Sequence, residues 1–111
     1  MNEEIAFHAI AWHTPILVSS GRRLWRTRDW YRIGRGEKDI SDFTWGYYGD
    51  GPHATAYSML YEAFGKRVAE EYAAKLMDEF VARCGMDGGF TLRGDDLCEM
   101  LGLKLKGRKR R

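Results

Sequence analysis

The sequence contains few of the residues that build disulfide frameworks and metal centres. It has two cysteines and three histidines among 111 residues. Cys84 and Cys98 have no C-x-x-C spacing, so we expect free thiols in a reducing compartment. The histidines, His8, His13 and His53, form no compact set with other ligating or acid–base residues. The sequence therefore predicts no metal, no cofactor and no catalytic residue.

Long hydrophobic runs are also absent. The longest apolar stretch, residues 6–18, is interrupted by His8, His13 and Pro15, whereas a membrane-spanning helix needs roughly 18 uninterrupted apolar residues. The first four residues, Met-Asn-Glu-Glu, are acidic where a secretory signal is positively charged. We therefore expect a cytoplasmic protein with no membrane partner.

The apolar residues that are present suffice for one folded domain. Hydrophobic residues make up 44% of the chain and aromatic residues 14%, and the glycines are spread out. This composition excludes collagen, low-complexity and fully disordered chains, and the length fits one domain and not two. We predict a single domain over residues 1–103 and a flexible basic segment over residues 104–111.

Two consecutive helices are the clearest local prediction. The spacing of Ala54, Tyr57, Leu60, Tyr61 and Phe64 predicts a helix over 52–64, with Asp50 or Gly51 as N-cap and Pro52 in the first helical position. Gly65 closes that helix. A second helix over 66–84 follows from a fourfold spacing of apolar residues that ends at Phe80, and Gly85 stops it.

The remaining elements are shorter. Residues 4–18 are predicted to be extended, because Pro15 argues against a helix there. Residues 21–35 carry strand-favouring aromatic residues between glycines and predict a strand or hairpin. Residues 90–92 form a short strand, and Asp95 and Asp96 open a last short helix. The expected fold is α+β, with a small antiparallel sheet from the N-terminal half packed against two consecutive helices and a short C-terminal helix.

Positive charge is concentrated in two places. The net charge is +2, yet residues 1–103 carry twelve basic and sixteen acidic residues, because six of the eighteen basic residues lie in the last eight positions. These six are Lys104, Lys106, Arg108, Lys109, Arg110 and Arg111. A second set, interleaved with aromatic residues, is Arg22, Arg23, Arg26, Arg28, Arg32 and Arg35. Such patterns suit phosphate contact and base stacking, while the alternatives are a solubilising terminus and the solvated face of a sheet.

A turn rich in glycine and aromatic residues precedes the first predicted helix. Gly46, Gly49 and Gly51 favour a structural turn, with an anion site at the helix N-terminus as the alternative. Trp45, Tyr47 and Tyr48 either pack as a lid over the helices or form an exposed surface that binds a partner.

The run from Phe43 to Pro52, Phe-Thr-Trp-Gly-Tyr-Tyr-Gly-Asp-Gly-Pro, resembles a signature of a family of small phage and prophage proteins of unknown function. Phe80-Val-Ala-Arg83 and the spacing of Phe90, Leu92, Asp96 and Leu97 also resemble that family, so the similarity covers about residues 43–101. The resemblance implies a phage or mobile-element origin and a bacterial cytoplasm, and it implies no activity.

Three hypotheses of function follow from these patterns. The first is a non-enzymatic phage accessory protein, such as an inhibitor of host defence, that binds nucleic acid or a host nucleoprotein complex through the two basic sets. The second is a protein-interaction module that uses Trp45, Tyr47 and Tyr48, with the basic segment steering it to an acidic protein partner. The third is a small enzyme using Asp50 and His53 at the glycine-rich turn. The oligomeric state does not follow from the sequence.

Overall fold

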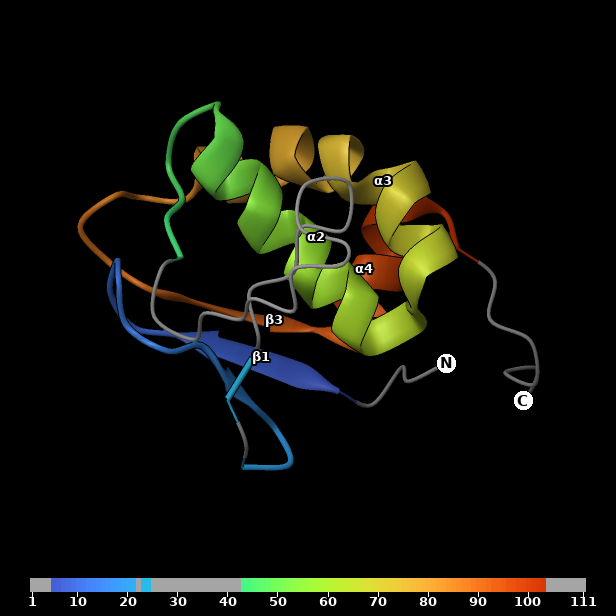
Figure 1. The fold of residues 1–111 in the computed structure, drawn as a ribbon, viewed down its shortest axis with the longest axis horizontal. Coiled ribbons are helices and arrows are strands. Elements are labelled where there is room, and N and C mark those ends of the chain that lie inside the picture. Colours follow the sequence, from blue (N-terminus) through green and yellow to red (C-terminus); the bar gives the residue numbers. More distant parts are fainter. Residues whose placement is uncertain (1–4, 22, 25–42, 104–111) are drawn as a thin grey trace, which may run out of the picture.

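The chain folds into a small antiparallel sheet with helices packed on one side of it (Figure 1). The structure is a computed structural model that describes residues 5–21, 23–24 and 43–103. Along the chain it contains β1 (Ala6–Ala9), β2 (Leu17–Val18), α2 (Asp50–Phe64), α3 (Lys66–Glu79), the 3-10 helix η1 (Val81–Arg83), β3 (Phe90–Arg93) and α4 (Gly94–Leu101). The α+β fold class predicted from the sequence is confirmed.

The sheet has the order β2-β1-β3 with antiparallel pairs throughout. In the central strand Phe7 pairs with Val18 on one side and with Leu92 on the other. All three side chains are buried, whereas the neighbouring His8 is exposed. Because side chains alternate between the faces of a strand, one face of the sheet is apolar, and the helices pack on that face.

The part of the sequence that supplies the strands differs from the expectation. The sheet does not come from the N-terminal half alone, because β3 supplies the longer pairing, four residue pairs against two for β2. The physical reason is burial, since Leu92 completes the apolar face only when it lies beside Phe7. Most of the strand predicted over 21–35 lies outside the described residues. Within it, Arg23 forms a β-bridge with Leu17 and Leu24 is buried.

Helix α2 is the central helix of the fold. Every residue from 54 to 60 is buried, as expected for a helix that is covered on all sides. Helix α3 is amphipathic and packs with Ala69, Ala73 and Leu76 inward. The predicted apolar position Tyr61 is an exception, because it remains 40% exposed and stacks on Tyr57 with ring centroids 6.1 Å apart.

Three helix ends differ from those predicted. Helix α2 starts at Asp50 with Gly49 as N-cap, so Pro52 lies later in the first turn than expected. The proline is tolerated there because the first four N–H groups of a helix have no acceptor within it. Helix α3 ends at Glu79 and not at Cys84, because Phe80 leaves the helical conformation and η1 follows. Helix α4 starts at Gly94, one residue early, and the Arg93 N–H donates to Asp96 Oδ2 at 3.2 Å.

Among the described residues no helix has both the length and the apolar character needed to cross a membrane. The predicted basic segment 104–111 lies outside the described part of the chain.

Candidate functional site

The aromatic turn before α2 is anchored by a buried tryptophan. Trp45 is fully buried, its Nε1 donates to the Gly88 carbonyl oxygen at 2.9 Å, and its ring meets the Phe90 ring edge-on at 5.1 Å. Of the three aromatic residues that the sequence offers as a partner-binding surface, Trp45 therefore belongs to the core. Tyr47 and Tyr48 are 38% and 59% exposed.

The glycines of this turn lie against protein atoms. A Cβ on Gly46, which has φ +92°, would lie 2.5 Å from Met86 Cγ and 2.9 Å from the Cys84 carbonyl oxygen. A Cβ on Gly51 would overlap the Thr44 hydroxyl and approach Tyr47. The close approach of backbone to side chain is what requires glycine here, which favours the structural turn over the anion site.

Trp12 also lies beside this turn, although the sequence pattern did not predict it as a site residue. Trp12 is half-buried, its Nε1 donates to the Trp45 carbonyl oxygen at 3.0 Å, and its ring meets that of Tyr47 at 5.7 Å and 61°. Residues 6–18 show no clean periodicity, so nothing in the sequence indicates that this tryptophan reaches residues 45–47. The only indication in the sequence is that a tryptophan occurs in this segment, which also contains a proline.

Met86 completes the exposed surface. It is 50% exposed and packs over Gly46. We call Trp12, Tyr47, Tyr48 and Met86 the aromatic patch. It combines three aromatic rings with a polarisable methionine side chain, residue types that are enriched at the centre of protein interfaces.

The hydroxyl group of Tyr48 is tied to α3. It donates to Asp78 Oδ1 at 2.9 Å. This hydrogen bond raises the pKa of Tyr48 above its ordinary value, with smaller contributions from burial and from the Asp78 charge. The Arg83 guanidinium acts in the opposite direction on this pKa, and its Nε donates to the backbone oxygen of Asp78 at 2.8 Å.

The histidines and cysteines lie at separate places in the described part of the chain. Within the described residues no group of three or more His, Cys, Asp or Glu side chains is placed to hold a metal ion. His8 is exposed on β1 with its Nδ1 3.3 Å from the Thr91 hydroxyl, and His53 lies in the first turn of α2. Cys84 and Cys98 form no disulfide bond, as predicted. Burial raises the pKa of Cys84 to about 11, which disfavours the nucleophilic thiolate.

The structure places one of the residues predicted to contact nucleic acid. Arg23 is exposed beside the end of β2. The others lie outside the described residues, and they are Arg22, Arg26, Arg28, Arg32, Lys104, Lys106, Arg108, Lys109, Arg110 and Arg111.

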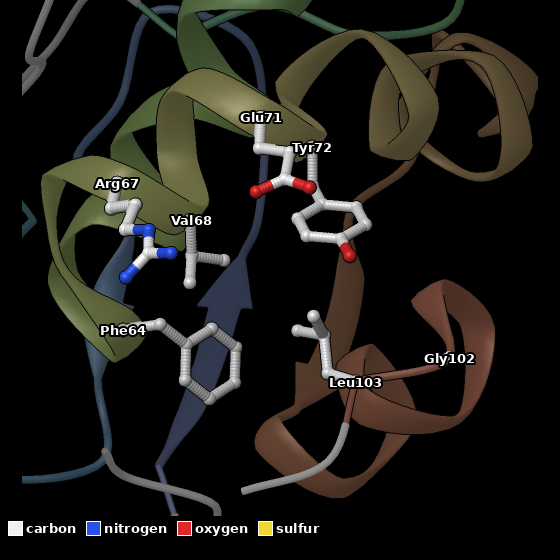
Figure 2. A pocket seen from close by; sticks show the side chains of 7 residues that line it. All are labelled: Phe64, Arg67, Val68, Glu71, Tyr72, Gly102 and Leu103. Atoms are coloured by element: carbon white, nitrogen blue, oxygen red, sulfur yellow. The ribbon is translucent and has the colours of Figure 1, made fainter.

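A surface groove of about 460 Å³ lies between α3 and the residues that follow α4. Phe64, Val68, Tyr72 and Leu103 point into this space (Figure 2). Arg67 and Glu71 line it from the exposed side of α3. An apolar floor with one residue of each charge does not specify a class of ligand.

A family model described as a family of unknown function, DUF6166, matches residues 15–102. The chain belongs to this family. The DUF6166 match includes residues 43–101, which carry the resemblance described above, and it begins nearer the N-terminus, at residue 15. No curated protein and no solved structure matches the chain. Within the aromatic patch, Tyr47, Tyr48 and Met86 lie inside the DUF6166 range and Trp12 precedes it.

Proposed function

We propose that this DUF6166 protein acts by binding a macromolecule, and that its target is nucleic acid or a nucleoprotein complex of a bacterial host. In this proposal the protein is a non-enzymatic accessory protein of phage or prophage origin, and inhibition of host defence is one form that its action takes.

The segregation of charge is the observation that carries this proposal. The described residues include six basic and ten acidic side chains, whereas the rest of the chain includes twelve basic and six acidic ones. Six of those cations occur within residues 104–111. A cationic segment of this density releases counterions from a phosphate backbone, which is the main source of affinity for nucleic acid. Trp25, Trp30 and Tyr31 among the arginines of the other segment add rings on which bases stack.

Titration of a labelled oligonucleotide at several salt concentrations tests the proposal. If all six cations contact phosphates, the log–log dependence of affinity on salt has a slope of about −5 on duplex DNA. A chain ending at Leu103 should lose most of that slope, and replacing Arg22, Arg26, Arg28 and Arg32 with glutamine should weaken binding further. The variant with Lys75→Gln and Arg93→Gln, two exposed cations of the described domain, is the matched control. Affinity independent of salt and of residues 104–111 would contradict the proposal.

A second candidate function is protein binding through the aromatic patch. The observation that favours it is the exposure of Tyr47, Tyr48 and Met86 next to Trp12. Affinity capture from a bacterial lysate, with and without nuclease, separates the two candidates. A nuclease-resistant, stoichiometric partner that is lost with Tyr47→Ala and Tyr48→Ala supports the second, and nuclease-sensitive capture that needs residues 104–111 supports the first.

The non-enzymatic part of the proposal has its own test. A small enzyme at the glycine-rich turn would use Asp50 and His53. His53→Ala then abolishes the biological activity if catalysis occurs there, and leaves it unchanged if the protein acts by binding.

A further inference from the structure

The polar atoms of the aromatic patch are engaged within the protein. Trp12 Nε1 donates to the Trp45 carbonyl oxygen, the Tyr47 hydroxyl is 2.9 Å from the Thr44 hydroxyl, and the Tyr48 hydroxyl donates to Asp78. The surface left to a partner therefore consists mainly of ring carbons and the Met86 side chain. These hydrogen bonds also hold the rings in place, which reduces the side-chain entropy that a partner must offset on binding.

Asp78 and Arg83 lie beside Tyr48, and a further acidic residue adjoins Met86 in the sequence. Asp78 accepts the hydrogen bond of Tyr48, and Asp87 directly follows Met86. Both carboxylates belong to exposed residues. The nearby Arg83 is the cation that lowers the pKa of Tyr48, and its guanidinium Nε donates a hydrogen bond to the backbone oxygen of Asp78. With the Arg83 Nε engaged, the exposed carboxylates of Asp78 and Asp87 favour a positively charged partner over a phosphate group.

We propose that the aromatic patch binds a segment of a partner protein that carries lysine or arginine side chains. Exposed aromatic rings attract a cation through the ring quadrupole, and the Asp78 carboxylate, 2.9 Å from the Tyr48 hydroxyl, adds the attraction of its charge. The apolar surface of Met86 and the rings accommodates the aliphatic stem of the same lysine or arginine side chain. This inference rests on the second candidate function and names the chemistry of its partner. It also assigns the patch a different role from the basic segments, whose partner is a polyanion.

A fluorescence anisotropy titration with a labelled arginine-rich peptide that carries one central leucine tests the inference on the full chain. Tyr48→Ala should weaken peptide binding by about fivefold to tenfold, because it removes the most exposed ring of the patch. Tyr61→Ala is the matched control, since Tyr61 is also an exposed tyrosine but lies on α2 outside the patch. Met86→Ala removes apolar surface at a half-exposed position and gives a second variant with little effect on folding.

The charge requirement is tested with a pair of double variants. The double variant Asp78→Asn, Asp87→Asn keeps a hydrogen-bond acceptor for Tyr48 and removes both carboxylates. It should lower the affinity for the peptide by about threefold for each lost charge at low salt. Glu70→Gln with Glu99→Gln removes the same charge from exposed positions on α3 and α4 and should leave the affinity unchanged. The same peptide with glutamate at every arginine position should not bind.

The outcomes that overturn the inference are distinct from those that overturn the proposed function. Equal affinity of the arginine peptide for the chain and for Tyr48→Ala shows that the patch is not its site. Loss of oligonucleotide binding in Tyr48→Ala, with peptide binding unchanged, shows that the patch stacks bases and overturns the inference while supporting the nucleic-acid function. In a third outcome, capture of a lysate partner requires Tyr48 and yet is blocked by the glutamate peptide and not by the arginine peptide. That result overturns the inference while the interaction function stands.

Discussion

Trp45 lies in the core, and Trp12 is the tryptophan that contacts the exposed ring of Tyr47. Trp45 lies in a run of surface-type turn residues, yet it is fully buried. Trp12 lies in a segment with no clear pattern and reaches the rings at the surface. The sequence predicted a cluster of aromatic residues at the turn but not which ring points inward. That direction is set by Gly88 and Phe90, more than forty positions away, which hold the Trp45 indole.

Gly46 provides a test of the turn at the residue scale. Gly46→Ala should lower the free energy of unfolding by about 2–4 kcal/mol, because the positive φ is strained for alanine and the new methyl group meets Met86 and Cys84. Gly21→Ala is the control, since Gly21 has a similar φ of +97° with nothing within 4 Å of a Cβ. Its cost should be about 1–2 kcal/mol, from the backbone conformation alone. Equal losses in urea denaturation would show that the contact with Met86 contributes nothing.

The pKa of Tyr48 gives a second test at this scale. Its pKa is raised mainly because its hydroxyl donates to Asp78, so Asp78→Ala, which removes both the acceptor and its charge, should lower that pKa toward the ordinary tyrosine value. The signal of a ¹³C-labelled tyrosine ring followed by NMR through alkaline pH measures the change. Because the folded pKa lies above the unfolded one, this interaction stabilises the fold below the unfolded pKa and is lost as the pH rises through the folded pKa. An unchanged pKa in Asp78→Ala would mean that the hydrogen bond does not form in solution.

At the scale of the element, the helices were predicted from residue spacing and their ends were not. The apolar residues of α2 and α3 recur every three or four positions, so both helices and the break at Gly65 are evident from the sequence. The end of α3 is not, because it depends on a contact with a later segment. Phe80 leaves the helix and packs edge-on against Phe90 with ring centroids 5.3 Å apart, while Val81 becomes fully buried.

The start of α4 allows a test of a single helix terminus. Asp96→Ala should lower the free energy of unfolding by about 0.5–2 kcal/mol, because it removes the acceptor for the Arg93 N–H and a negative charge in the first turn. Asp96→Asn keeps an acceptor and should cost less. Thermal unfolding followed by circular dichroism measures both. Equal losses for the two variants would show that charge, and not the hydrogen bond, stabilises the terminus.

At the scale of the whole molecule, the pairing of β1 with β3 joins the two ends of the fold. The sequence predicted an extended segment near residue 6 and a short strand near residue 90, but it did not predict that they are neighbours. Hydrophobic alternation predicts which face of a strand is buried and says nothing about its partner. The location of the aromatic patch was missed in part for the same reason, because Trp12 reaches it from the loop that follows β1.

Leu92→Ala tests the contribution of this pairing to global stability. Leu92 is 1% exposed and lies opposite Phe7, so its truncation should cost about 2–5 kcal/mol. That is a large part of the roughly 5–15 kcal/mol expected for a domain of this size. Thr91→Ala, on the exposed face of the same strand, should cost far less. Similar losses in chemical denaturation for the two variants would contradict the placement of Leu92 in the core.

The same pairing determines the order in which the chain can fold as it is synthesised. Strand β1 leaves the ribosome first, and its four-residue partner β3 is translated only after all of α2 and α3. Until then β1 has one edge open and its apolar face incompletely covered, a state that favours association with other strands. We therefore expect nascent chains stalled before residue 90 to be the species most prone to aggregation and most dependent on chaperones.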